Sequence, residues 1–143
     1  TGMPLLRYRT RDLVSINYGK CDCGRTMPRI SKVLGRTDDM IVVRGINIFP
    51  SQIEEVLLGI KGTQPHYQIV VEREKGLDKL TILVEMDQSL FSDEIKQLQA
   101  FEEKVAREVA SVLSISAKIR LVRPKSIERS EGKAKRIIDK RML

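Results

Sequence analysis

Four short polar stretches contain residues whose types and order could do chemistry. They are YRTRD (8–12), GRTDD (35–39), VRGINIFPSQIEE (43–55) and ERSEGKAKR (128–136). An ionised carboxylate such as that of Asp12 can accept two hydrogen bonds at once, and the guanidinium of Arg36 makes directional bonds to oxygen atoms. Both residue types are also common in ordinary turns. The pattern by itself therefore leaves a purely structural role open for each of them.

The stretch near the end of the chain offers cations. A flexible ammonium at a loop tip, such as that of Lys133, can offset negative charge that develops in a transition state. Lys135 competes for that role, and both lysines also suit a solvated basic tail. In the middle of the chain, Gly45 lacks a Cβ and would let another molecule approach the backbone closely, although a simple turn would also call for glycine.

Two cysteines, Cys21 and Cys23, have a spacing that could chelate a metal ion. A closed zinc site takes four ligands, and the single histidine, His66, is far away in the sequence. We therefore predict no metal site within this chain and a structural role for His66, while zinc completed by ligands from elsewhere stays open. Two cysteines are too few for a disulfide framework and indicate a reducing, cytoplasmic setting.

Hydrophobic spacing from residue 40 onward predicts the elements that would position these residues. Apolar residues of 51–60 recur at i, i+3, i+4 and i+7, which indicates an amphipathic helix, and Ser51 and Glu54 stand at capping-box spacing. Apolar residues of 79–86 alternate instead, as on one buried strand face. The predicted order is a strand after residue 40, the helix at 51–60, strands at 68–72 and 79–86, a helix at 92–114, a strand at 117–123 and a short basic helix at 133–141.

This order predicts an α+β fold in which a small, mostly antiparallel sheet carries helices on one face. Three short strands are predicted before it, at 4–9, 12–17 and 29–35, and they would bury little by themselves. We predict that residues 1–35 belong to the edge of a larger β-rich body. The chain, which begins TGMPLL, is therefore expected to be a piece of a longer protein.

The composition narrows the class of protein. Hydrophobic residues make up 41% of the chain, and no apolar run approaches the roughly 18 residues of a membrane-spanning helix, so we expect no membrane partner. The formal charge of +7 is concentrated at the two ends, which would suit a phosphorylated small molecule, a nucleic acid or an acidic membrane surface, and charge alone does not choose among them. An RRM-like RNA-binding module would carry stacking aromatics, and 68–72 and 79–86 contain none, so we expect no nucleic-acid partner. A regulatory domain that senses a small ligand stays the other alternative.

Taken together and in order, the four stretches resemble the C-terminal signatures of the adenylate-forming superfamily, which includes acyl-CoA synthetases, luciferases and adenylation domains. Within it, the chain is most similar to the phenylacetate–coenzyme A ligases. The resemblance runs along the whole chain and is far more specific than a lone GRxD or GK. It is carried by CDCGRTMPRI (21–30), RGINIFPSQIEEVL (44–57) and EGKAKRIIDKR (131–141).

The resemblance implies a reaction in two steps. A carboxylic acid reacts with ATP to give an acyl-adenylate and pyrophosphate, and the thiol of coenzyme A then displaces AMP. The implied cofactors are ATP, Mg²⁺ and coenzyme A, and the implied substrate is an aryl acid such as phenylacetate. The implied partner is a large N-terminal domain of the same chain, without which this fragment would be inactive. A homodimer is left open.

The resemblance also implies roles for individual residues. Asp12 would accept hydrogen bonds from the ribose hydroxyls of ATP, and Arg36 would contact the same nucleotide. The resemblance implies that residues 1–35 end the large N-terminal domain, that 36–39 form a hinge and that 40–143 form the small domain. Asp38 matches the hinge residue at which the small domain of the family turns between two orientations. Lys133 would enter the site for adenylation, and the turn at Arg44–Gly45 would replace it for thioester formation.

Overall fold

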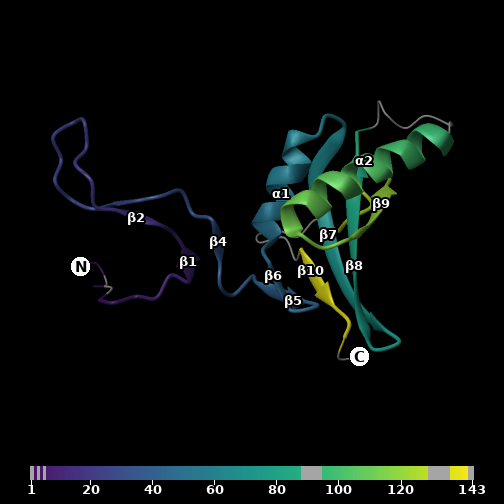
Figure 1. Ribbon diagram of the computed structural model, residues 1–143, viewed down its shortest axis with the longest axis horizontal. Helices are drawn as coiled ribbons and strands as arrows, with labels where there is room; N and C mark the ends of the chain where they lie inside the picture. The colour runs from purple at the N-terminus through teal and green to yellow at the C-terminus, as the bar shows by residue number, and fades with distance from the viewer. Residues whose placement is uncertain (1, 3, 5, 88–94, 129–135, 142–143) are drawn as a thin grey trace. The chain divides into compact units, whose positions relative to one another are not determined.

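The computed structural model describes residues 2, 4, 6–87, 95–128 and 136–141. The chain divides into two compact units, Thr1–Met40 and Ile41–Leu143 (Figure 1). Among the described residues, no helix combines the length and the apolar character that crossing a membrane requires.

Among its described residues, the first unit contains four strands of two residues each. They are β1 (Asp12–Leu13), β2 (Ile16–Asn17), β3 (Arg29–Ile30) and β4 (Gly35–Arg36). β1 pairs with β4 and β2 with β3, both antiparallel, and the first pairing sets Asp12 opposite Arg36. The predicted strands at 12–17 and 29–35 are thus broken into shorter pieces, and the described residues of 4–9 form no strand. Apolar side chains such as those of Leu6 and Tyr18 are exposed within this unit, so a longer strand would have little to bury.

The second unit has the predicted α+β fold. A four-stranded sheet in the order β10-β7-β8-β9 lies beside a separate two-stranded hairpin, β5–β6. The elements are β5 (Ile41–Val43), β6 (Ile46–Ile48), α1 (Pro50–Gly59), β7 (Thr63–Glu74), β8 (Leu77–Met86), α2 (Ile95–Leu113), β9 (Lys118–Val122) and β10 (Ile137–Asp139).

The four-stranded sheet is mixed. β7 and β8 form the predicted antiparallel hairpin, which turns at Lys75 and Gly76 with positive φ angles of 51° and 82°. β9 is parallel to β8, and β10 is parallel to β7. The expectation of a mostly antiparallel sheet therefore holds for the central pair, β7 and β8, whereas the two outer strands, β9 and β10, are parallel to their neighbours. A helical crossover such as α2 returns the chain in parallel with the strand it left.

Both helices pack on one face of the sheet, as predicted. α1 contacts β7, α2 contacts β9, and the two helices contact each other (Figure 1). The core between them contains fully buried side chains from both layers, such as Ile53 of α1, Ile69 of β7, Ile82 of β8 and Val109 of α2. Their alternation on the strands and their i, i+4 spacing on the helices produce one continuous apolar layer.

The start of α1 corrects the predicted capping box. The helix begins at Pro50, whose fixed φ suits the first helical position, and Phe49 is the N-cap. The side chain of Gln52 accepts a hydrogen bond from the Phe49 N–H at 3.1 Å. The contact is therefore shifted by two residues from the predicted Ser51–Glu54 pair, and Glu54 bonds elsewhere.

The end of the chain corrects a second expectation. The basic helix predicted at 133–141 is wrong for Ile137–Asp139, which forms β10 beside β7, while residues 133–135 lie outside the described part of the chain. Two consecutive β-branched residues, Ile137 and Ile138, favour a strand once a partner edge is present. Ile137 also packs against the core of this unit.

Candidate functional site

In the first unit, a cluster of charged side chains surrounds Arg36. Its Nη1 lies 3.2 Å from Asp12 Oδ1, while its Nε and Nη2 donate to the two carboxylate oxygens of Asp38 at 3.0 and 2.9 Å. Asp39 lies farther off, with its Oδ2 3.7 Å from Arg36 Nε, and Arg11 Nη1 lies 3.9 Å from Asp38 Oδ2. The antiparallel pairing of β1 with β4 brings Asp12 and Arg36 together. Three of the residues predicted from the sequence are therefore neighbours.

The electrostatics of this cluster favour the charged forms of Arg36 and Asp38. The hydrogen bond from Arg36 holds the pKa of Asp38 below its ordinary value, and the same bond raises the pKa of Arg36. The side chains of Asp12 and Asp38 are 29% and 30% exposed, so solvent and ligands can reach them. A carboxylate beside a fixed guanidinium can accept hydrogen bonds from hydroxyl groups while the cation faces an anion.

In the second unit, Arg44 and Gly45 form the exposed turn between β5 and β6. Their φ angles are 51° and 78°, and two consecutive left-handed residues are typical of the type I′ turn of a two-residue hairpin. A Cβ added at Gly45 would meet no heavy atom within 4 Å, so the space above this backbone is open. Arg44 Nε donates to the carbonyl oxygen of Asp78 at 2.7 Å, which ties the turn to the start of β8.

Beneath this turn lies a second charged cluster, which we call the Asp78–Arg141 junction. Arg141 Nη1 donates to the carbonyl oxygen of Val42 at 2.6 Å and to Asp78 Oδ2 at 3.0 Å, and its Nε donates to Asp139 Oδ1 at 2.9 Å. Arg73 Nε donates to the other oxygen of Asp78 at 3.0 Å. Sequence analysis missed this cluster, because its members are far apart in the chain and share no motif.

The junction is strongly ionic. Partial burial raises the pKa of the Asp78 carboxyl, but the hydrogen bonds from Arg73 and Arg141 outweigh that effect and hold it below its ordinary value. The hydrogen bond to Asp139 raises the pKa of Arg141 and lowers that of Asp139. The side chains of Asp78 and Arg141 are only 11% and 19% exposed, so this is more enclosed than an ordinary surface ion pair.

Lys133 and its competitor Lys135 lie outside the described residues, and Arg136 is the first described residue after them. Arg136 Nη2 lies 2.7 Å from Glu54 Oε1, and its Nη1 lies 3.2 Å from the hydroxyl of Tyr67. The Tyr67 hydroxyl in turn donates to the carbonyl oxygen of Pro50 at 2.8 Å. Glu54 therefore connects α1 to the start of β10, a role its position in the sequence did not reveal.

The side chains of Cys21 and Cys23 lie next to each other, and the described residues add no further metal ligand beside them. The Sγ atoms of Cys21 and Cys23 are 3.1 Å apart, and Arg29 Nη1 lies 3.5 Å from Cys21 Sγ. The hydrogen bond from Cys23 lowers the pKa of Cys21. Within the described part of the chain, no three His, Cys, Asp or Glu side chains gather as a metal site would require. His66 lies exposed on β7.

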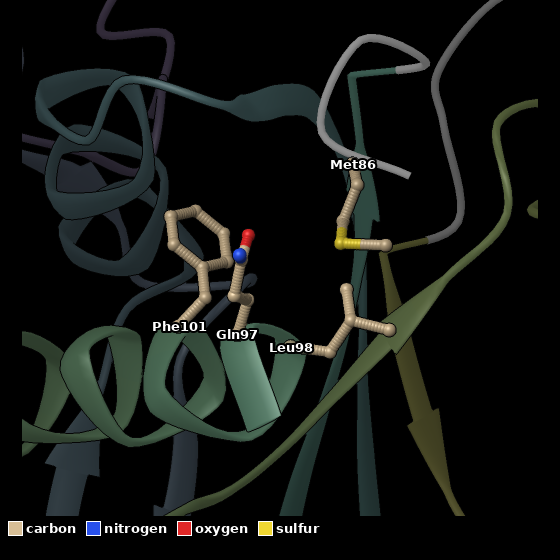
Figure 2. Close-up of a pocket in the computed structure, with 4 residues that line it drawn as sticks. All are labelled: Met86, Gln97, Leu98 and Phe101. Carbon is tan, nitrogen blue, oxygen red and sulfur yellow. The ribbon is translucent and has the colours of Figure 1, made fainter. Parts of the chain in front are cut away.

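A small pocket between β8 and α2 contains none of the predicted site residues. It is lined by Met86, Gln97, Leu98 and Phe101 and has a volume of about 170 Å³ (Figure 2). Small-molecule sites usually exceed about 300 Å³ and combine apolar walls with convergent polar groups. The pocket is therefore smaller than a typical small-molecule site.

The fold defines a class of protein, a small α+β domain that follows a separate compact unit in the chain. Residues 45–141 match the AMP-binding enzyme C-terminal domain, and the chain belongs to that family. It is 43% identical to the phenylacetate-coenzyme A ligase of Thermus thermophilus, over 97% of this chain and 34% of that protein. The resemblance to the C-terminal region of phenylacetate–coenzyme A ligases is thus confirmed. The chain spans about a third of the length of the curated relatives it matches.

Solved structures agree with this family. A 2-hydroxyisobutyryl-CoA ligase in the postadenylation state is 38% identical, covers 92% of this chain with 28% of its own, and has a TM-score of 0.79. The same ligase with coenzyme A in the thioesterification state is 37% identical over 93% of this chain and 28% of its own, with a TM-score of 0.69. A domain of phenylacetate-coenzyme A ligase from Bacteroides vulgatus is 36% identical over 73% of this chain and 94% of that domain, with a TM-score of 0.66.

Proposed function

We propose that this chain is the C-terminal part of an ATP-dependent ligase that joins an aryl acid, phenylacetate first among them, to coenzyme A. The observation that carries the proposal is the similarity to a phenylacetate-coenzyme A ligase along 97% of the chain. In the first step a carboxylate oxygen attacks the α-phosphorus of ATP and pyrophosphate leaves. In the second step the sulfur of coenzyme A attacks the acyl carbon, AMP leaves, and the thiol proton is lost.

The first unit supplies nucleotide contacts in this proposal. Asp12 accepts hydrogen bonds from the ribose hydroxyls, and Arg36 contacts the same nucleotide. Their separation of 3.2 Å supports a joint role, since one ligand can reach both side chains. Mg²⁺ would accompany the phosphates of ATP and offset their negative charge.

The second unit supplies a different residue or segment to each of the two steps. Lys133 stabilises the negative charge of the adenylation transition state, and the turn at Arg44–Gly45 approaches the pantetheine arm of coenzyme A during thioester formation. The open space above Gly45 supports the second role. Asp38 is the hinge between the two arrangements. A relative that has been solved in both a postadenylation and a thioesterification state supports this use of two conformations.

An RNA-binding module has less support. In the described strands of the four-stranded sheet, the aromatic residue is Tyr67, which is 3% exposed and bonded to Pro50. Recognition of single-stranded RNA on a sheet depends on exposed aromatic faces. A sensor of small ligands would bind without turnover, which the following assay distinguishes.

The test uses the full-length protein that contains this chain. With phenylacetate, ATP, Mg²⁺ and coenzyme A, we expect acyl-CoA, AMP and pyrophosphate in equal amounts, and no turnover from this chain alone. Lys133→Ala should slow adenylation about 10²–10³-fold, because a charge-stabilising contact is lost. It should spare thioester formation from supplied acyl-adenylate. Lys135→Ala is the matched control and should leave adenylation close to that of the unaltered enzyme.

Other aryl acids in the same assay decide the substrate. Failure of every acid to release pyrophosphate would contradict the proposed ligase. Equal loss of both half-reactions in Lys133→Ala would contradict the division of labour between the two conformations.

A further inference from the structure

The β5–β6 hairpin depends on other segments for its position. It forms a two-stranded sheet of its own, with three residues in each strand, outside the four-stranded sheet. Val43, next to the turn, and Ile48, at the base of the hairpin, are fully buried and anchor the hairpin in the core. The Arg44–Gly45 turn directly after Val43 is exposed, so no apolar packing holds the two turn residues themselves and polar contacts can set their orientation.

Two hydrogen bonds supply that orientation, and both belong to the Asp78–Arg141 junction. Arg44 Nε donates to the backbone oxygen of Asp78 at 2.7 Å, and Arg141 Nη1 donates to the backbone oxygen of Val42 at 2.6 Å. The two bonds hold the hairpin at Val42 and Arg44, the residues on either side of Val43. They connect it to the start of β8 and to the end of β10.

The arginine is suited to this task because its guanidinium is a rigid fork. It contacts Val42, Asp78 and Asp139 at once, and a lysine ammonium cannot reproduce that planar arrangement. Asp78 completes the junction by binding Arg73 with its second oxygen. Each member thus holds another member in one geometry, as supporting residues do around a preorganised site.

We propose that Asp78 and Arg141 are positioning residues for thioester formation, which hold the Arg44–Gly45 turn in the geometry that it presents to the thiol arm of coenzyme A. This inference rests on the proposed function. Because adenylation uses Lys133 instead of the turn, the junction should affect the second half-reaction selectively.

The experiment measures each half-reaction separately in the full-length enzyme. Adenylation is followed by pyrophosphate exchange into ATP, and thioester formation is followed from supplied acyl-adenylate over a range of coenzyme A concentrations. Arg141→Gln should slow thioester formation roughly ten- to a hundred-fold, the size expected when a reacting group is misplaced by a fraction of an ångström to one ångström. Pyrophosphate exchange should change less than about two-fold, because adenylation does not use the turn.

Three further variants separate positioning from charge and from folding. Arg141→Lys keeps the charge but not the fork, so we expect a loss close to that of Arg141→Gln. Asp78→Asn keeps the backbone oxygen that binds Arg44, and we expect a smaller but equally selective loss. Lys140→Gln is the control, because it removes an exposed ion pair with Glu72 next to the junction, and it should change neither half-reaction.

A selective loss of thioester formation in Arg141→Gln and Arg141→Lys would support the inference. Full rescue by Arg141→Lys, equal loss of both half-reactions, or no loss in either would overturn the inference. If Arg141→Gln does not fold, as judged by thermal unfolding, Asp139→Asn replaces it, since it removes one carboxylate partner and leaves the guanidinium. An unaltered enzyme that releases no pyrophosphate would instead contradict the proposed function, so the two failures are distinguishable.

Discussion

At the scale of single residues, Arg36 shows how one side chain can bind two carboxylates. It donates to Asp12 and to both oxygens of Asp38. The family resemblance assigned roles to all three residues, yet the sequence could not predict that they share hydrogen bonds. That contact depends on the register in which β1 pairs with β4.

The pKa of Asp38 gives a direct test of the Arg36 cluster. Replacing Arg36 with Gln should raise the pKa of the Asp38 carboxyl toward its ordinary value, because the charged hydrogen bonds are lost. The measurement is a pH titration by carbon NMR of protein labelled at Asp carboxyl groups. Arg11→Gln is the control and should shift the pKa less, since its guanidinium lies 3.9 Å away.

The free energy of unfolding of the unaltered protein and that of Arg36→Gln should differ in a way that depends on pH. A carboxyl whose pKa is lowered by folding stabilises the folded state above its unfolded-state pKa, and this contribution is lost as the pH falls through the lower folded-state value. The variant should therefore be less stable than the unaltered protein near neutral pH, and the difference should shrink in acid. An unchanged Asp38 pKa in Arg36→Gln would contradict the cluster.

At the scale of elements, hydrophobic periodicity predicted individual helices and strands but missed contacts between residues far apart in the sequence. The apolar spacing of 51–60 and the alternation of 79–86 predicted α1 and β8. The final strand was missed because Ile137–Asp139 is too short to show a period, and its pairing partner β7 lies far earlier in the chain. The Arg141–Asp78 bond, which spans 63 residues, left no sequence signal for the same reason.

The β5–β6 turn tests whether Gly45 serves the backbone or the ligand. Its φ of 78° is left-handed, so Gly45→Ala should lower the free energy of unfolding by about 1 kcal/mol, and Gly45→Asn by less, because asparagine tolerates this conformation. Urea denaturation measures both. Gly59→Ala, in α1 and equally free of close contacts, is the matched control and should stabilise by about 0.5–1 kcal/mol.

Activity separates the two roles of Gly45. If the bare backbone must face the pantetheine arm, Gly45→Asn should fold nearly normally and still lose thioester formation. Normal thioester formation in a stable Gly45→Asn enzyme would leave the glycine with a turn role alone.

At the scale of the whole molecule, the division into two units follows Met40, and the proposed hinge at Asp38 lies two residues before it. The sequence indicated such a division through the change from short strands to a regular α+β order. It could not predict how Asp38 is held within the first unit, where both of its carboxylate oxygens bind Arg36.

Replacing Asp38 with Pro tests the hinge in the full-length enzyme. Proline fixes φ near −65° and restricts the preceding Thr37, so a pivot at this position should favour one arrangement over the other. We expect one half-reaction to slow by about ten-fold or more while the other is nearly unchanged, measured by pyrophosphate exchange and by thioester formation from supplied acyl-adenylate. Asp38→Asn removes the ionic contact with Arg36 but leaves φ free, so it separates the loss of the ion pair from the loss of rotation. If Asp38→Asn reproduces the selectivity of Asp38→Pro, the effect belongs to the ion pair and residue 38 is not the pivot.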